Sequence, residues 1–175
     1  MGKAGKNLMS SRPIHSITSS LLEDLLERAA ASPRLRAIHR LHDDDWEHCH
    51  RMLNALMPGT YVRPHRHDSK YQSEAFILLR GKLALLIFDE DGSVDLIHSR
   101  ILSPSDGLFG MDIPPGIWHS LVALEAAVIY EVKGHPAGGY VQERDKCFAP
   151  WSPEEDSAES YDYLRLLETV AKTLT

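Results

Sequence analysis

The chain has 175 residues, of which 43% are hydrophobic and 25% are charged, and its formal net charge at pH 7 is −6. This size and composition are typical of a globular protein with one domain and a sizeable core. The net negative charge indicates solubility and implies no basic face for nucleic acid, so we expect no nucleic-acid partner.

Neither the beginning of the chain nor its apolar runs indicate a membrane or secretion signal. A few basic residues near the N-terminus precede no apolar stretch, which argues against a signal peptide. The longest apolar run, from Leu83 to Phe88, is far too short to span a bilayer. Cys49 and Cys147 lie outside any CxxC pair, and we interpret both as free, buried thiols in a reducing compartment. We therefore expect a cytoplasmic protein without a membrane partner.

The pattern along the chain predicts four parts within a single domain. These are a flexible N-terminal arm over residues 1–15, a helical segment over 16–45, a β-barrel over 46–150 and a C-terminal helix over 151–175. The boundaries follow the change from leucines at helical spacing to short alternating runs, and back again.

In the N-terminal helical segment, Ser20 and Glu23 fit a capping box in which Ser20 is the N-cap. Leucine and alanine then repeat at helical spacing as far as Ala29, and Pro33 is expected to end this helix. A shorter helical turn is predicted over residues 34–40. The C-terminal helix shows one apolar stripe, which consists of Leu164, Leu167, Val170 and Leu174.

Between the two helices, short apolar runs are separated by frequent turn signals such as Pro58-Gly59 and Asp91-Gly92. Such a pattern is typical of an all-β protein with antiparallel strands. The predicted strands cover residues 50–56, 60–67, 74–79, 82–88, 94–99, 108–113, 119–124 and 127–132. The sequence therefore predicts an antiparallel sandwich or barrel.

Two histidines of the second run, His65 and His67, have the spacing that a strand brings to one face. Residues i and i+2 point the same way on a strand, whereas they do not share a face of a helix. Their Cα atoms should lie about 7 Å apart, which allows both rings to reach one metal ion. In a chain with ten histidines such a pair also arises by chance. His48 and His50 form a second pair, which we interpret as ordinary residues at the rim of a strand.

The residues after the first pair make it more specific. Glu74 begins the next predicted strand, and Gly81 turns the chain into the strand after that. Further along, Pro114 and Gly116 form a Pro-x-Gly turn directly before His119. Such a turn fixes the entry of a strand, so His119 is expected to point inward at the start of its strand.

At this point the sequence resembles the cupin superfamily. The run from Gly59 through His65, His67 and Glu74 to Gly81 is similar to the first cupin motif, and the Pro-x-Gly turn before His119 is similar to the second. The resemblance implies a cupin barrel, also called a double-stranded β-helix or jelly roll, with a metal site of three histidines and one glutamate. The implied ligands are His65, His67, Glu74 and His119. The loop before Glu74 is longer than is usual in cupins.

A closer resemblance is to the WbuC-type cupin-fold metalloproteins, and it runs from about residue 18 to 155. The family is named after sugar-antigen gene clusters rather than after a settled activity, so the resemblance implies a fold and one bound divalent metal ion but no reaction. Imidazole and carboxylate ligands suit Zn, Fe, Ni or Mn, and affinity alone does not choose among them. The matching stretches are residues 52–56, 61–67, 76–81, 113–119 and 148–153.

Strand parity also suggests residues that contact a small molecule. Tyr61 and Arg63 share the parity of the two histidines that follow them, so both are expected to face the barrel interior. A buried arginine needs a partner, which is either an anionic or sugar-like ligand or an inward acid such as Glu131. Tyr71, in the loop before the glutamate, either lines the mouth of the pocket or is a surface aromatic.

These observations favour a metal-dependent enzyme that acts on a small sugar-like or anionic molecule, and its catalytic residues are left unassigned. A non-catalytic metal- or ligand-binding module is the first alternative, and a metal-free sugar epimerase-like cupin is the second. An open coordination position with a path to solvent would distinguish the enzyme from a closed module. The terminal arm and helices make a homodimer the expected assembly.

Overall fold

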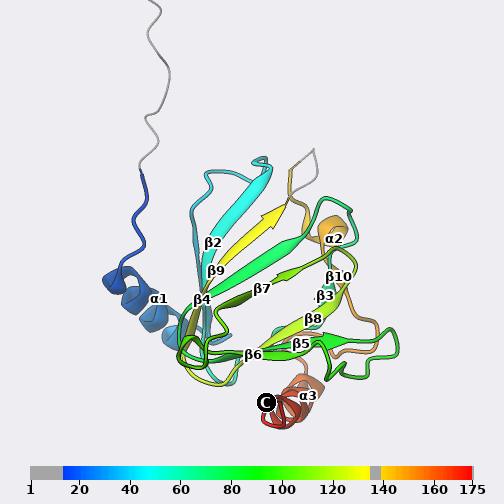
Figure 1. Cartoon of the computed structure of the whole chain (residues 1–175). Helices are drawn as coiled ribbons and strands as arrows, with labels where there is room; N and C mark the ends of the chain where they lie inside the picture. The colour runs from blue at the N-terminus through cyan, green and yellow to red at the C-terminus, as the bar shows by residue number, and fades with distance from the viewer. Residues whose placement is uncertain (1–13, 135–138, 175) are drawn as a thin grey trace, which may run out of the picture.

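The computed structural model describes residues 14–134 and 139–174, which form two facing antiparallel sheets of five strands each (Figure 1). The first sheet contains, in spatial order, β1 (Arg36–Arg40), β2 (Cys49–Leu56), β9 (Ala127–Gly134), β4 (Glu74–Arg80) and β7 (Gly110–Ile113). The second contains β10 (Cys147–Phe148), β3 (His65–Arg66), β8 (Trp118–Ala123), β5 (Leu83–Phe88) and β6 (Arg100–Leu102). The chain crosses repeatedly between the sheets, as in a jelly roll. The predicted all-β cupin barrel is confirmed.

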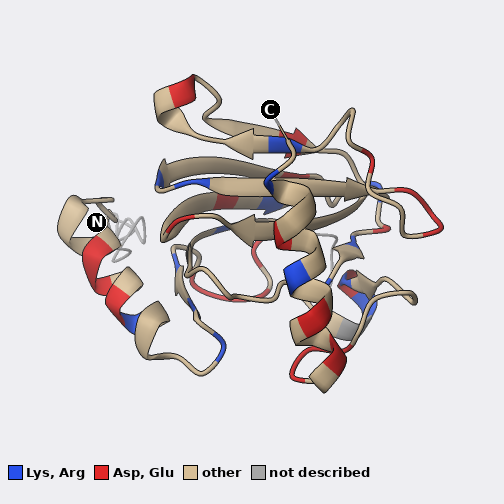
Figure 2. Ribbon diagram, turned by 90° about the horizontal axis from the view of Figure 1, so that it is seen from below, with Lys and Arg blue, Asp and Glu red and all other residues tan. Residues whose placement is uncertain are grey.

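A helix covers the outer face of each sheet (Figure 1). Near the N-terminus, α1 (Ser19–Ala31) packs on the first sheet through Leu25 and Ala29, which are fully buried against Leu53 and Val128. Near the C-terminus, α3 (Ala158–Ala171) packs its leucine stripe on the second sheet, beside Trp118. Acidic and basic residues are interspersed along both helices (Figure 2). None of the described helices has the length and apolarity that crossing a membrane requires.

The two long helices do not begin where their sequence patterns suggest: α1 begins earlier and α3 begins later. The N-cap of α1 is Thr18, whose Oγ1 accepts a hydrogen bond from the Leu21 amide at 3.3 Å, so the predicted capping box at Ser20 is wrong. As predicted, α1 ends before Pro33. The C-terminal helix begins only at Ala158, because residues 151–157 form turns that pack against the second sheet.

The predicted helical turn over residues 34–40 is also wrong, because residues 36–40 form β1 at the edge of the first sheet. Leu35 has a φ of 54°, a left-handed conformation that ends the turn after α1. The chain then pairs antiparallel with β2, with Arg36 opposite Leu56. Pairing with a neighbouring strand outweighs the local helical pattern. The first strand of the barrel therefore lies within the predicted helical segment.

Two other predicted strands are replaced by turns or irregular chain. Residues 95–99 form a turn because Asp95 Oδ1 accepts hydrogen bonds from the amides of Ile97 and His98 at 2.9 and 3.1 Å, and the strand β6 follows it. Of the predicted strand over residues 60–67, only β3 pairs with neighbouring strands. Most of the predicted N-terminal arm, residues 1–13, lies outside the described residues.

The space between the sheets is divided into an apolar part and a polar part. The apolar part is filled by thirteen buried residues from both sheets, and Leu83, Leu85, Leu102 and Ile129 among them are fully buried. Burial of this surface is the main stabilising contribution to the barrel. The polar part contains the histidines singled out above. Both cysteines lie on the surface, so the expectation that they are buried is wrong.

Candidate metal centre

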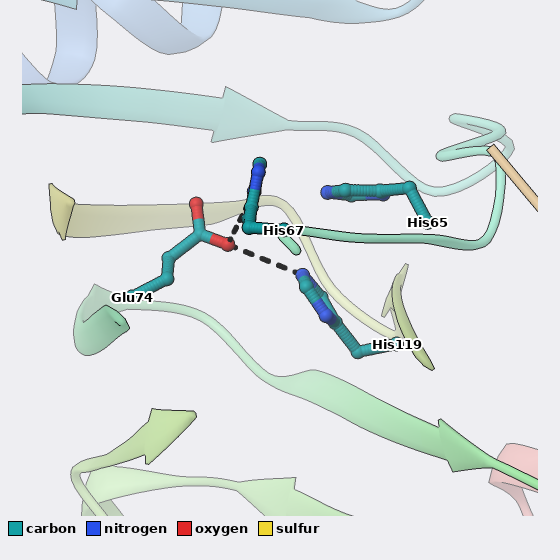
Figure 3. A group of neighbouring side chains, drawn as sticks. All are labelled: His65, His67, Glu74 and His119. Atoms are coloured by element: carbon teal, nitrogen blue, oxygen red, sulfur yellow. Dashed lines mark hydrogen bonds and ion pairs between the residues drawn. The ribbon is translucent and has the colours of Figure 1, made fainter. Parts of the chain in front are cut away.

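Four buried side chains converge in the polar part of the barrel, and we refer to them as the His–Glu cluster: His65, His67, Glu74 and His119 (Figure 3). One nitrogen of each ring and a carboxylate oxygen lie within 4.8 Å of one another. Glu74 Oε2 lies 3.2 Å from His119 Nε2 and 3.3 Å from His67 Nε2. The structure thus brings together all four residues that the cupin resemblance implied as ligands.

The cluster bridges the two sheets. His65 on β3 and His119 on β8 are register partners in the second sheet, whereas Glu74 is the first residue of β4 in the first sheet. The Pro-x-Gly turn before β8 is tied to this group, because the Gly116 amide donates a hydrogen bond to the His67 carbonyl at 2.8 Å. Gly116 has a φ of 84°, a conformation that glycine adopts without strain. The turn therefore sets the position of His119 relative to His67.

Each histidine of the cluster is oriented by a backbone carbonyl. The Nδ1 atoms of His65, His67 and His119 lie 2.9, 2.6 and 2.9 Å from the carbonyl oxygens of Arg63, Asp145 and Ile117. A carbonyl only accepts hydrogen bonds, so each Nδ1 carries the proton and each Nε2 presents a lone pair to the centre. Metal-binding histidines are commonly fixed in this way.

The facing lone pairs suit a cation between them. Burial, followed by the charge of Lys146, lowers the pKa of His65 well below its ordinary value, so this ring stays neutral. Burial would raise the pKa of Glu74, but Lys133 and the facing imidazoles outweigh it and lower the pKa, so this carboxylate is ionised. His67 Nε2 is buried and makes no hydrogen bond. Three imidazole lone pairs and one carboxylate are a donor set that suits a divalent ion. The four residues therefore fit the metal that the resemblance implied.

A second layer of charge lies behind Glu74. Lys133 Nζ lies 3.8 Å from Glu74 Oε1 and 3.6 Å from Glu131 Oε1, and Asn54 donates a hydrogen bond to Glu131 Oε2. Burial and the charge of Glu74 raise the pKa of Glu131 to about 8. Burial would lower the pKa of Lys133, but the two carboxylates raise it. Lys133 thus remains charged and holds Glu74 in place.

The cluster faces a cavity of about 530 Å³. His65, Glu74 and His119 line this cavity, together with Phe76 and apolar residues of both sheets. The first residues of β1 and the chain around α2 (Gln142–Asp145) also line it. A small molecule of the size that such cavities hold would therefore contact the cluster directly.

The structure places two of the three predicted ligand-contacting residues away from the barrel interior. Tyr61 donates a hydrogen bond to the Pro153 carbonyl at 2.9 Å, and Arg63 donates to the hydroxyl and the carbonyl of Ser152 at 3.2 and 3.3 Å. Val62, between them, is the residue that lines the cavity. The expected inward orientation of Tyr61 and Arg63 is therefore wrong, and so is the suggested pairing of Arg63 with Glu131.

Tyr71 lies in the loop before β4, where 63% of its surface is exposed, and Lys70 packs over its ring. It does not contribute to the wall of the cavity. His50, interpreted as a rim residue, is buried instead. Its ring stacks on His42 at a centroid distance of 4.2 Å, and both line the cavity.

Several residues of the site were not predicted from the sequence. Lys133 was detectable in principle, because buried residues alternate along β9 from Ile129 through Glu131 to Lys133. Lys146 and the Asp145 carbonyl come from the chain around α2, which shows no periodic pattern. Gln72 is buried behind His67, and its amide donates to the same Asp145 carbonyl.

Comparison with known proteins adds no activity. A family model described as a domain of unknown function (DUF6016) matches residues 17–99. Curated protein sequences give no match. A conserved protein of unknown function from Streptococcus pyogenes is similar in structure, with a TM-score of 0.49, 14% identity, and coverage of 75% of this chain and 100% of that one.

Two similar structures are described as cupins. A cupin superfamily protein from Desulfitobacterium hafniense has a TM-score of 0.45 and 12% identity, over 58% of this chain and 78% of that one. A cupin 2 domain-containing protein from Halorhodospira halophila has a TM-score of 0.45 and 16% identity, over 80% of this chain and 83% of that one. The assignment of the fold itself rests on the strand order described above.

Proposed function

We propose that the protein binds one divalent metal ion through the His–Glu cluster and acts as a metal-dependent enzyme on a small polar molecule in the adjoining cavity. The observation that carries this proposal is the set of three imidazole nitrogens and one carboxylate oxygen within 4.8 Å of one another, at the wall of a cavity of about 530 Å³. A structural metal site is normally closed, whereas a catalytic site retains a position for substrate.

The protein itself supplies binding, orientation and electrostatics. A bound ion would act as a Lewis acid toward a carbonyl or hydroxyl group of the substrate. Phe76 and Leu121 give the cavity apolar walls, and the polar groups of Asn54, Tyr140 and Gln142 line other parts of it. This combination suits a small molecule with both apolar and hydrogen-bonding parts. The sugar-antigen gene clusters after which the WbuC-type proteins are named support a sugar-like substrate.

Cobalt substitution distinguishes this proposal from a closed, non-catalytic metal site. The protein loaded with Co²⁺ should show visible absorption bands that change when azide is added, because azide enters an open position. Glu74→Gln should weaken Co²⁺ binding, since it removes the anionic ligand. A Co²⁺ spectrum that does not respond to azide would support the non-catalytic module. Failure of Co²⁺ to bind would favour the metal-free alternative.

We also infer that the protein forms a homodimer, as the sequence analysis expects. Light scattering during gel filtration measures the assembly directly. A mass close to twice the 19.7 kDa of one chain supports this inference, and a mass of one chain contradicts it.

A further inference from the structure

Lys146 brings a positive charge to the cavity wall beside the His–Glu cluster. It follows Asp145 at the end of α2 and lines the cavity together with His65 and Glu74. Lys133, in contrast, is paired with the carboxyl groups of Glu74 and Glu131 at 3.8 and 3.6 Å. Within the described parts of the chain, no carboxylate lies within ion-pair distance of the Lys146 ammonium. A partly buried cation without a counter-ion is costly unless a ligand supplies the negative charge.

The cavity as a whole has an excess of positive charge. Its walls contain five basic and three acidic residues, which are Arg34, Arg36, Arg40, Lys133, Lys146, Asp45, Glu74 and Glu131. Arg36 and Arg40 lie on β1 and Arg34 lies just before it. Glu155 pairs with Arg34 and Arg36, and Asp45 pairs with Arg40. Lys146 has no such partner among the residues that the structure describes. A divalent ion in the cluster would increase the positive charge further.

The chain around α2 fixes Lys146 relative to the cluster. The carbonyl of the preceding residue, Asp145, accepts the hydrogen bond that orients His67. The Lys146 Nζ also lies 5.4 Å from the centre of the Phe148 ring, which packs against His65 at a centroid distance of 6.4 Å. One short segment therefore orients a ring of the cluster and positions the cation. A molecule that contacts both would be held in a defined orientation.

We propose that Lys146 anchors an oxyanion, either a carboxylate or a phosphate group, of the small molecule that binds in the cavity next to the His–Glu cluster. This assignment rests on the proposed function and names the charged part of its substrate. Burial, followed by the charge of Lys133, lowers the pKa of Lys146 to about 8, so the ammonium is mostly charged at pH 7. A bound oxyanion would form a charge-assisted hydrogen bond with it.

Calorimetric titration of the metal-free protein at pH 7 tests the anchor, with inorganic phosphate and malonate as two separate probes at constant ionic strength. Lys146→Gln removes the charge and nearly preserves the length, whereas Lys146→Arg preserves the charge. Lys82→Gln is the matched control, because Lys82 lies outside the cavity and pairs with Asp106 at 3.6 Å. We expect Lys146→Gln to weaken binding of the better probe by about 10- to 100-fold. Lys146→Arg should retain most of the binding, and Lys82→Gln should not change it.

The better probe identifies the anchored group as phosphate or carboxylate. The proposal is overturned if neither probe binds the wild type, if Lys146→Gln binds as tightly as the wild type, or if Lys82→Gln loses as much. Lys146→Met serves as the neutral variant if Lys146→Gln does not fold.

The metal content of the same variants is measured separately, before the metal is removed, and Lys146→Gln should bind as much metal as the wild type. Absence of metal from the wild type would contradict the proposed function, independently of the anion measurement.

Discussion

Lys133 is the residue whose replacement tests the electrostatics of the site most sharply. Its ammonium lies between two buried carboxylates, 3.8 Å from Glu74 and 3.6 Å from Glu131. Methionine has a similar volume and flexibility, so Lys133→Met removes the charge with little change in packing. The variant leaves the ionised Glu74 carboxylate without this cation and next to the carboxyl group of Glu131. We expect a large loss of stability.

The magnitude follows from the distances. At an effective dielectric constant of about 20, the ion pair with the ionised Glu74 corresponds to about 4 kcal/mol of Coulomb energy. Glu131 contributes less, because its pKa is raised to about 8 and it is mostly protonated at pH 7. The net loss is smaller than the Coulomb energy, because the lysine no longer has to be desolvated. Removing one partner of a buried pair usually costs about 3–5 kcal/mol. The melting temperature should fall on the order of 10 °C.

Urea denaturation of the metal-free protein measures this loss. The control is Lys82→Met, which breaks an exposed ion pair with Asp106 and should cost less than about 1 kcal/mol. Adding Glu131→Gln to Lys133→Met should change the stability little at pH 7, because the raised pKa of Glu131 already leaves this carboxyl mostly protonated. The reasoning is refuted if Lys133→Met is no less stable than the Lys82→Met control.

The remaining predictions concern acid sensitivity and one glycine. Metal-free protein should lose stability as the pH falls below about 4.5, because the folded state lowers the pKa values of His65 and Glu74 and the unfolded chain therefore binds more protons. Between about pH 6.5 and 4.5 the raised pKa of Glu131 opposes the effect of His65. Urea midpoints that do not decrease from about pH 4.5 to about pH 3 would contradict this. Gly107→Ala should lower the free energy of unfolding by about 1–2 kcal/mol, and Gly81→Ala should lower it several times as much. Both glycines have positive φ, but only at Gly81 would a Cβ meet a carbonyl oxygen, that of Ala126, at 2.2 Å. Equal melting temperatures of the two variants would count against this.

Short-range geometry indicated the histidines of the His–Glu cluster, whereas Glu74, which lies in the other sheet, was implied by the cupin resemblance. Strand parity places His65 inward on β3, and the Pro-x-Gly turn positions His119. The same parity argument was wrong for Tyr61 and Arg63. Pro64 has no N–H to donate to a sheet, and residues 61–64 are not paired as a strand, so the alternation shifts by one residue before His65.

Other parts of the site lie beyond the predicted elements. Lys133 lies one residue beyond the predicted end of its strand, since a lysine after an apolar run looks like the beginning of a loop. Continuing the alternation of Ile129 and Glu131 would place it inward, and in the structure the strand extends far enough to pair Lys133 with Glu74. Lys146 reaches the cavity because the chain returns to the barrel after β9 and pairs β10 with β3. Such long-range pairing is not visible in the composition of the segment.

The metal content of the purified protein tests the central claim most directly. Elemental analysis after anaerobic purification should give about one divalent ion per chain for the wild type, and far less for His65→Ala. His98→Ala is the matched control, because His98 is an exposed histidine that contacts Asp95 outside the cluster; it should retain the metal of the wild type. Wild-type protein without stoichiometric metal, or His65→Ala with a full complement, would contradict the account.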